Sequence, residues 1–164
     1  MDNIIVDFTG KKQVLKGCLG CECASGNLVA GVGVLYKNKN LYVLQDFELP
    51  IDGFIIISPN RHVEKFTELS QEEQVDIFSV ANKILHILES NGVAEEYNLI
   101  LEEKQGIHLH LWLMPRHKWM IEKYGNVIKN IKAIQEYSLQ NLRTKENINK
   151  VLQTCELIKK EMNK

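Results

Sequence analysis

The stretch Ile107–Leu113 alternates leucine with bulky ring-bearing side chains. Successive side chains of a β-strand point to opposite faces of a sheet, so this pattern predicts a strand. Its leucines would face a hydrophobic core, and the other face would carry His108, His110 and Trp112. Two imidazoles at neighbouring positions of one face favour a functional site over the alternative, an ordinary polar outer face.

The segments around this strand predict an antiparallel α+β domain. One long helix is expected after Ser70, the N-cap of a capping box with Glu73, and Asn91-Gly92 would end it. The expected inner face of the helix comprises Val75, Phe78, Ala81, Leu85 and Leu88. Further strands are expected at 28–36, 41–45, 54–57 and 98–101. Runs of strands with one long central helix indicate an antiparallel sheet rather than a doubly wound one.

The last part of the chain predicts a helical extension. From about Gly125 to Lys164 there is no proline, and apolar residues recur at helical spacing. One helix is expected from Val127 to Leu142, and Thr144 would cap a second. We therefore predict a domain at 1–119 and an extension at 120–164 that packs on the domain or on a dimer partner.

The charge balance narrows the range of partners. Twenty basic and twenty-one acidic side chains give a formal net charge of −1, whereas general nucleic-acid binders carry a basic excess. The N-terminus lacks the basic start of a secretory signal, and no apolar run reaches the ~18 residues of a membrane span. We expect a cytoplasmic protein with no nucleic-acid or membrane partner.

Three of the four cysteines lie between Cys18 and Cys23. Cys18-x-x-Cys21 supplies two thiolates for a zinc ion, which is half of a site. Cys18, Cys21, His62 and His108 would complete a closed tetrahedral site. Cys23 complicates this choice of ligands, and a redox pair or ordinary surface cysteines are the alternatives.

His108–Arg116 resembles the signature of the histidine-triad (HIT) superfamily, which reads His-x-His-x-His, two apolar residues and often Pro-Arg. Upstream, Asp46, Gly53, the apolar strand before Pro59, and His62 match the order and spacing of that family. The Cys-x-x-Cys pair lies where zinc-containing bacterial members carry theirs. The resemblance covers roughly residues 15–119.

This resemblance implies a HIT-like fold and a nucleotide substrate. His110 matches the middle histidine, which attacks the α-phosphorus and forms a covalent nucleotidyl-histidine. His108 matches the first histidine, a ligand of a structural Zn²⁺ in the metal-containing relatives, and would share it with Cys18, Cys21 and His62. Asp46 matches the acid that binds the ribose hydroxyls. A homodimer is also implied.

Two departures from the family pattern affect the expected chemistry. Trp112 stands at the third triad position, where the hydrolases have histidine and the transferase branch has glutamine. An indole has one N–H donor and cannot act as a general acid. The loop before the motif is short and acidic, which leaves Lys104, Gln105 and Arg116 as candidates for phosphate binding.

These observations favour a nucleotide hydrolase or phosphoramidase, including dinucleoside polyphosphate hydrolases, that acts through His110. One alternative is a non-catalytic nucleotide-binding or scaffold protein with a degenerate triad. Another is a nucleotidylyltransferase of the uridylyltransferase-like branch, although those enzymes are about two such domains long. A zinc redox switch that uses Cys23 is a further alternative.

Overall fold

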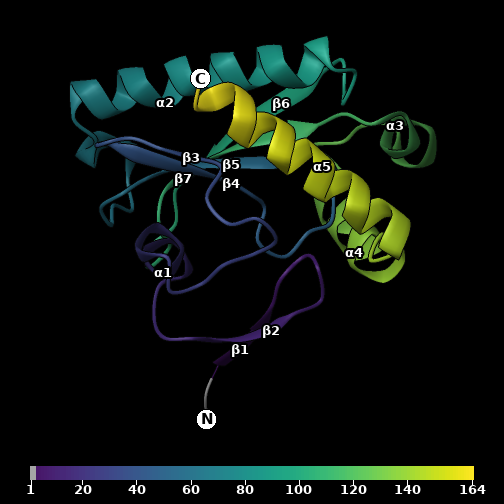
Figure 1. The fold of residues 1–164 in the computed structure, drawn as a ribbon, viewed down its shortest axis with the longest axis horizontal. Helices are drawn as coiled ribbons and strands as arrows, with labels where there is room; N and C mark the ends of the chain where they lie inside the picture. The colour runs from purple at the N-terminus through teal and green to yellow at the C-terminus, as the bar shows by residue number, and fades with distance from the viewer. Residues whose placement is uncertain (1–2) are drawn as a thin grey trace.

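The computed structural model describes residues 3–164 and centres on a five-stranded antiparallel sheet (Figure 1). The strands are β3 (Tyr36–Lys37), β4 (Leu41–Gln45), β5 (Ile55–Pro59), β6 (Tyr97–Glu102) and β7 (His110–Pro115). Their order across the sheet is β3-β4-β5-β7-β6. With its helices, the molecule is an antiparallel α+β protein, as the sequence predicts.

The register of the central strands separates the two faces of the sheet. Ile57 of β5 pairs with Leu111 of β7, and Ile56 pairs with Trp112 one position along. Leu111 and Ile57 belong to a buried apolar cluster on one face, which we call the core face. Trp112 and Ile56 line a pocket on the other face, which we call the pocket face.

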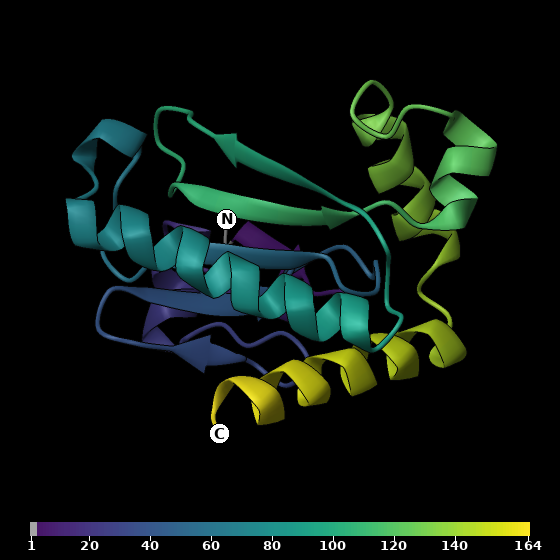
Figure 2. The same cartoon turned by 90° about the horizontal axis from the view of Figure 1, so that it is seen from above.

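Two long helices cover the core face. They are α2 (Gln71–Ser90) and α5 (Lys145–Met162), which pack against each other (Figures 1 and 2). The predicted capping box of α2 is confirmed, because Ser70 Oγ accepts from Glu73 N and the Glu73 side chain accepts from Ser70 N. This local signal defines the start of α2 independently of its packing.

The predicted inner face of α2 is partly wrong. Val75 and Phe78 are 59% and 48% exposed, whereas Ile77, Val80 and Ile84 are buried. The helix carries apolar residues on more than one stripe, so helical spacing alone did not determine which stripe meets the sheet. The residues that turn inward are Ile77, Val80, Ala81, Ile84 and Leu88.

The predicted strand at 28–36 is also wrong, because only Tyr36 and Lys37 form β3. Gly31 and Gly33 have φ values of +55° and +76°, in the left-handed region that interrupts a strand. A Cβ on Gly31 would lie 2.4 Å from Phe8 Cζ, so the segment also needs glycine for close packing. Leu28 and Leu35 are buried in a loop rather than in a strand, whereas Val29 is 42% exposed.

Several short elements were not anticipated from the sequence. They are the two-stranded hairpin of β1 (Asn3–Val6) and β2 (Lys12–Leu15), α1 (Leu19–Ser25), the 3₁₀ helix η1 (Phe66–Glu68) and α3 (Lys118–Tyr124). The strand predicted from Ile107 begins only at His110, so His108 lies in the preceding loop. In Figure 1, α1 and the hairpin lie on the opposite side of the sheet from α2.

The C-terminal residues form α4 (Ile131–Asn141) and α5. The first helix is shorter than predicted, since Val127 lies before it. Thr144 caps α5, and its side chain accepts from Asn147 N. Val151 and Ile158 of α5 belong to the core-face cluster. The boundary at 119/120 stays a prediction. Within residues 3–164, no helix has the length and apolarity needed to span a membrane.

Candidate metal centre and adjoining pocket

The two cysteines of the Cys-x-x-Cys motif are held at the start of a short helix. Cys18 is the N-cap of α1, and Cys21 lies in its first turn. Gly20 lies between them, where a Cβ would approach His108 Cγ to 2.5 Å. Tyr42 of β4 donates a hydrogen bond to the carbonyl of Gly20 at 2.9 Å. Glycine at this position therefore lets the cysteine turn lie directly against the imidazole.

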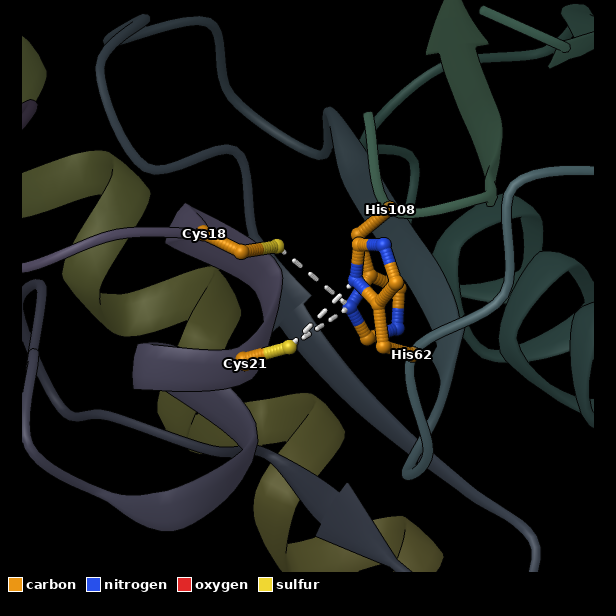
Figure 3. A group of neighbouring side chains, drawn as sticks. All are labelled: Cys18, Cys21, His62 and His108. Atoms are coloured by element: carbon orange, nitrogen blue, oxygen red, sulfur yellow. Dashed lines mark hydrogen bonds between the residues drawn. The ribbon is translucent and has the colours of Figure 1, made fainter. Parts of the chain in front are cut away.

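Cys18, Cys21, His62 and His108 come together into one cluster (Figure 3). Their four ligand atoms all lie within 4.8 Å of one another. Cys21 Sγ is 3.4 Å from His62 Nδ1 and 3.6 Å from His108 Nδ1, and Cys18 Sγ is 3.8 Å from His108 Nδ1. These are the four residues that the family resemblance assigns to a metal.

The cluster fits a tetrahedral zinc ion. Zn–S bonds of ~2.3 Å and Zn–N bonds of ~2.0–2.1 Å place neighbouring ligand atoms about 3.3–3.8 Å apart, which matches the three separations above. His108 Nε2 lies 2.9 Å from Pro59 O, so its N–H donates there and leaves the Nδ1 lone pair toward the thiols. Burial lowers the pKa of His108, which favours the neutral form that binds metals.

His62 has a matching outer partner. Its Nε2 lies 3.5 Å from Glu64 Oε1, while its Nδ1 points toward Cys21. A carboxylate on the far nitrogen of a metal-binding histidine orients the ring. Cys23, in contrast, is buried outside the cluster, and burial raises its pKa to about 12. A thiol held protonated in this way is a poor nucleophile, which disfavours the redox alternative.

A pocket of about 520 Å³ adjoins the metal cluster on the pocket face. Its floor is formed by side chains that point to the same face of the sheet from three neighbouring strands. These are Tyr42 and Leu44 of β4, Ile56 and Ser58 of β5, and His110 and Trp112 of β7. The alternation predicted for His110 and Trp112 therefore holds, and both side chains reach one cavity.

The imidazole of His110 is fixed in orientation. Its Nδ1 lies 2.8 Å from His108 O, so the Nδ1–H donates to that carbonyl. The Nε2 atom then carries the lone pair, and it makes no hydrogen bond to any residue in the range 3–164. An imidazole with one nitrogen held by a hydrogen bond and the other free is suited to nucleophilic attack.

Trp112 packs beside His110. The two rings are 5.8 Å apart at their centroids with an interplanar angle of 30°, and Phe54 contacts the indole edge-on at 5.4 Å. The indole Nε1 is buried and has no hydrogen-bond partner among the described residues. At the third triad position, the Trp112 side chain thus packs against its neighbours and cannot act as a general acid.

Asp46 follows β4 and lines the pocket. Its Oδ1 accepts from the backbone N–H groups of Glu48 and Leu49 at 3.0 and 2.8 Å. Burial raises its pKa to about 6, and the two N–H donors oppose that rise. No described residue donates a hydrogen bond to the second carboxylate oxygen, Oδ2, and Asp46 is one of the residues that line the pocket.

The three candidates for phosphate binding do not line the pocket. Arg116 is paired with Glu96, and its backbone N–H donates to Glu96 O. Lys104 and Gln105 are exposed in the loop before β7, although the next two residues of that loop do reach the pocket. The structure thus brings the metal-cluster residues, His110, Trp112 and Asp46 to one region and leaves these three outside it.

The pocket also contains residues that sequence reasoning did not single out. Gln135 and Leu139 of α4 line it, and both come from the C-terminal extension. Their helical spacing predicted α4, but nothing in the sequence signalled that one face of α4 would meet the triad strand. Ser58 lines the pocket too, where its hydroxyl donates to Leu109 O at 2.8 Å.

Comparison with known proteins identifies the class to which this fold and site belong. The HIT domain family matches residues 29–119, which is more than half of the chain. The protein therefore belongs to the HIT family.

The relatives are distant. A HIT-like protein of Methanocaldococcus jannaschii is 23% identical over 121 residues, covering 70% of this chain and 91% of that protein. The bis(5'-adenosyl)-triphosphatase of Dictyostelium discoideum is 18% identical, with coverage of 63% and 72%. The nitrilase and fragile histidine triad fusion protein of Caenorhabditis elegans is 25% identical over 88 residues, but the match spans only 20% of its length.

Solved structures share the fold. A zinc-bound histidine triad family protein from Mycobacterium smegmatis superposes with a TM-score of 0.61 at 17% identity, covering 89% of this chain and 93% of that chain. The diadenosine triphosphate hydrolase of Plasmodium falciparum gives a TM-score of 0.54 at 16% identity, with coverage of 79% and 76%.

Proposed function

We propose that this protein is a nucleotide hydrolase that acts through a covalent nucleotidyl-histidine at His110, with dinucleoside polyphosphates as the substrate class. One observation carries the proposal. The Nδ1–H of His110 is bound to His108 O, so the Nε2 lone pair is directed to a 520 Å³ pocket that also holds Asp46. Family membership and relatives named for diadenosine triphosphate hydrolysis support it.

The reaction needs two displacements at the α-phosphorus. In the first, the Nε2 lone pair forms a P–N bond as the P–O bond to the leaving phosphate breaks, and that phosphate departs with the electron pair. In the second, water attacks phosphorus, the P–N bond breaks, and the imidazole regains its lone pair as water releases a proton. The products are a nucleoside monophosphate and the remaining nucleoside phosphate.

Trp112 sets the preference among leaving groups. An amine leaving group must gain a proton as it departs, and the indole cannot supply one. A polyphosphate leaving group departs as an anion and needs no such help. We therefore propose phosphoanhydrides rather than phosphoramidates as substrates, a narrower choice than the sequence alone offered.

Cys18, Cys21, His62 and His108 would hold a structural zinc ion. Four protein ligands leave no open position, and a closed site contributes folding energy rather than chemistry. In this protein it would fix α1 to the loop that carries His108, whose carbonyl orients His110. The zinc-bound relative supports this assignment. A homodimer and a cytoplasmic location stay predictions from the family resemblance and the sequence.

The test is to trap the intermediate. The purified protein is mixed with diadenosine triphosphate labelled at its α-phosphates and quenched in alkaline detergent, because phosphoramidates are acid-labile. We expect a labelled protein band that is lost in His110→Ala and kept in His86→Ala, since His86 is exposed on α2. Label that persists in His110→Ala would contradict the assignment of the nucleophile.

A non-catalytic nucleotide-binding protein is the second candidate. It is favoured by the buried, unpartnered indole of Trp112 and by Lys104, Gln105 and Arg116 lying outside the pocket. For this candidate, diadenosine triphosphate binds, but neither a labelled protein nor AMP appears over several hours.

A further inference from the structure

The C-terminal extension forms part of the pocket. The family match ends at residue 119, yet α4 contributes Gln135 and Leu139 to the pocket lining. The amide of Gln135 makes no hydrogen bond within residues 3–164, although the backbone carbonyl of the same residue accepts from Ser138 Oγ. Gln135 therefore offers an amide donor and an amide acceptor, neither paired within the described residues, at the wall of the pocket.

The extension also fixes the loop that carries Asp46. Arg143 Nη2 donates to Glu48 O at 3.2 Å, and Asn147 Nδ2 donates to Pro50 O at 2.7 Å. These side chains flank the junction between α4 and α5. The turn after α4 and the first turn of α5 are therefore tied by hydrogen bonds to Glu48 and Pro50, which closely follow Asp46.

The strand register gives the direction of a ligand in the pocket. Leu44 pairs with Ile56, which pairs with Trp112, so these three form a row across the floor. His110 lies two residues before Trp112, and Asp46 lies two residues beyond Leu44 and bonds Phe54 O through its N–H. Because the strands are antiparallel, these two residues flank the row on opposite sides.

The row of Asp46 lies near α4. Phe54, which pairs with Asp46, shares an apolar cluster with Ile134 of α4. Four residues along a strand span about 13 Å, so the His110 row and the Asp46 row lie toward opposite ends of the pocket floor. A nucleotide with phosphate at His110 and ribose at Asp46 places its base toward α4.

We propose that Gln135 is a specificity-determining residue that hydrogen-bonds the edge of the nucleobase, with Leu139 as the apolar wall beside it. The proposal rests on the proposed function, which supplies the nucleotide. A side-chain amide offers one donor beside one acceptor and matches a base edge with the complementary pair, such as the N6 amine and a ring nitrogen of adenine. The extension would thus select the substrate, while the HIT domain carries the chemistry.

The test measures binding, so that it does not depend on turnover. Titration calorimetry of the purified protein with AMP and with ribose 5-phosphate separates contacts to the base from contacts to the ribose and phosphate. Gln135→Met keeps the length of the side chain and removes its hydrogen bonds. Glu136→Met is the matched control, because Glu136 is exposed on the same helix and does not line the pocket.

We expect Gln135→Met to bind AMP about tenfold or more weakly, with ribose 5-phosphate unchanged and Glu136→Met like the unmodified protein. Equal AMP binding by Gln135→Met and the unmodified protein overturns the role of Gln135 and leaves the proposed function standing. Equal weakening of AMP and ribose 5-phosphate overturns it too, because the effect is then not on the base. If the unmodified protein binds no AMP, both proposals fail.

Discussion

The two faces of the central sheet are built from the same strands, but one packs against helices and the other borders a cavity. On the core face, side chains such as Leu111, Leu113 and Ile57 are buried against α2 and α5. On the pocket face, His110, Trp112 and Ser58 border a cavity. Neighbouring residues of β7 therefore alternate between the hydrophobic core and the pocket. The comparison shows that a residue of β7 lines the pocket because of the face to which its side chain points, and not because of how far along the strand it lies.

The largest predicted effect concerns the metal cluster. A bound zinc ion would stabilise the pocket face, as apolar packing stabilises the core face. We expect about one zinc ion per chain, and its loss in His62→Ala. With free zinc at about 1,000 times Kd, the free energy of unfolding falls by about 4 kcal/mol when the metal is lost. Metal analysis and denaturant unfolding check this, with His86→Ala as the control. A folded, metal-free protein indifferent to chelator would refute the site.

A large-to-small substitution on the core face should lower the free energy of unfolding strongly and leave the residues that line the pocket unchanged. Leu113→Ala removes a fully buried side chain, so we expect a loss of about 3 kcal/mol in the free energy of unfolding. Leu139→Ala, at the pocket, should cost less than about 1 kcal/mol because Leu139 is 39% exposed. Urea unfolding measures both. Equal losses would show that the pocket face is packed as tightly as the core face.

Asp46 should show a trade-off between stability and binding. Its pKa of about 6 lies above the ordinary value near 4, so the folded protein holds the proton more tightly than the unfolded chain. The contribution of Asp46 to stability is then fully present below about pH 4 and is lost as the pH rises through 6. We expect Asp46→Asn to be more stable by about 1–2 kcal/mol at pH 7.5, with the advantage absent at pH 4. Unfolding at both pH values tests this, and AMP binding should weaken.

The last prediction concerns Trp112 and a reaction rate rather than stability. Trp112→His supplies a titratable proton next to His110, and we expect it to raise hydrolysis of an AMP phosphoramidate about tenfold or more. Hydrolysis of diadenosine triphosphate should change less, because its leaving group needs no proton. A fall in both rates would mean that the indole is a working part of a different specificity.

Much of the fold and site could be predicted from local signals. The capping box at Ser70 and Glu73, the cap at Thr144 and the alternation of His110 and Trp112 depend on near neighbours in the chain. The grouping of Cys18 and Cys21 with two distant histidines came from the family resemblance, because spacing alone left other choices.

What could not be predicted depends on contacts between distant segments. Val75 and Phe78 were assigned to the core because α2 carries more than one apolar stripe, and only the sheet and α5 decide between the stripes. Nothing in the sequence indicated that Gln135 lines the pocket, since this depends on where α4 packs. Arg116 was offered as a phosphate ligand, but Glu96, twenty residues earlier, pairs with it.

Three residues of α5 are buried among the side chains of the core face, namely Val151, Cys155 and Ile158. This burial limits which positions of α5 can accept substitutions during evolution. The sequence of α5 is constrained because these three residues, spaced three or four positions apart, pack among side chains of the strands and α2. Variation should therefore collect on its outward lysines and glutamates. On the roles proposed for His110 and Gln135, substitutions in α4 would change substrate preference while the sequence of β7 stays constant.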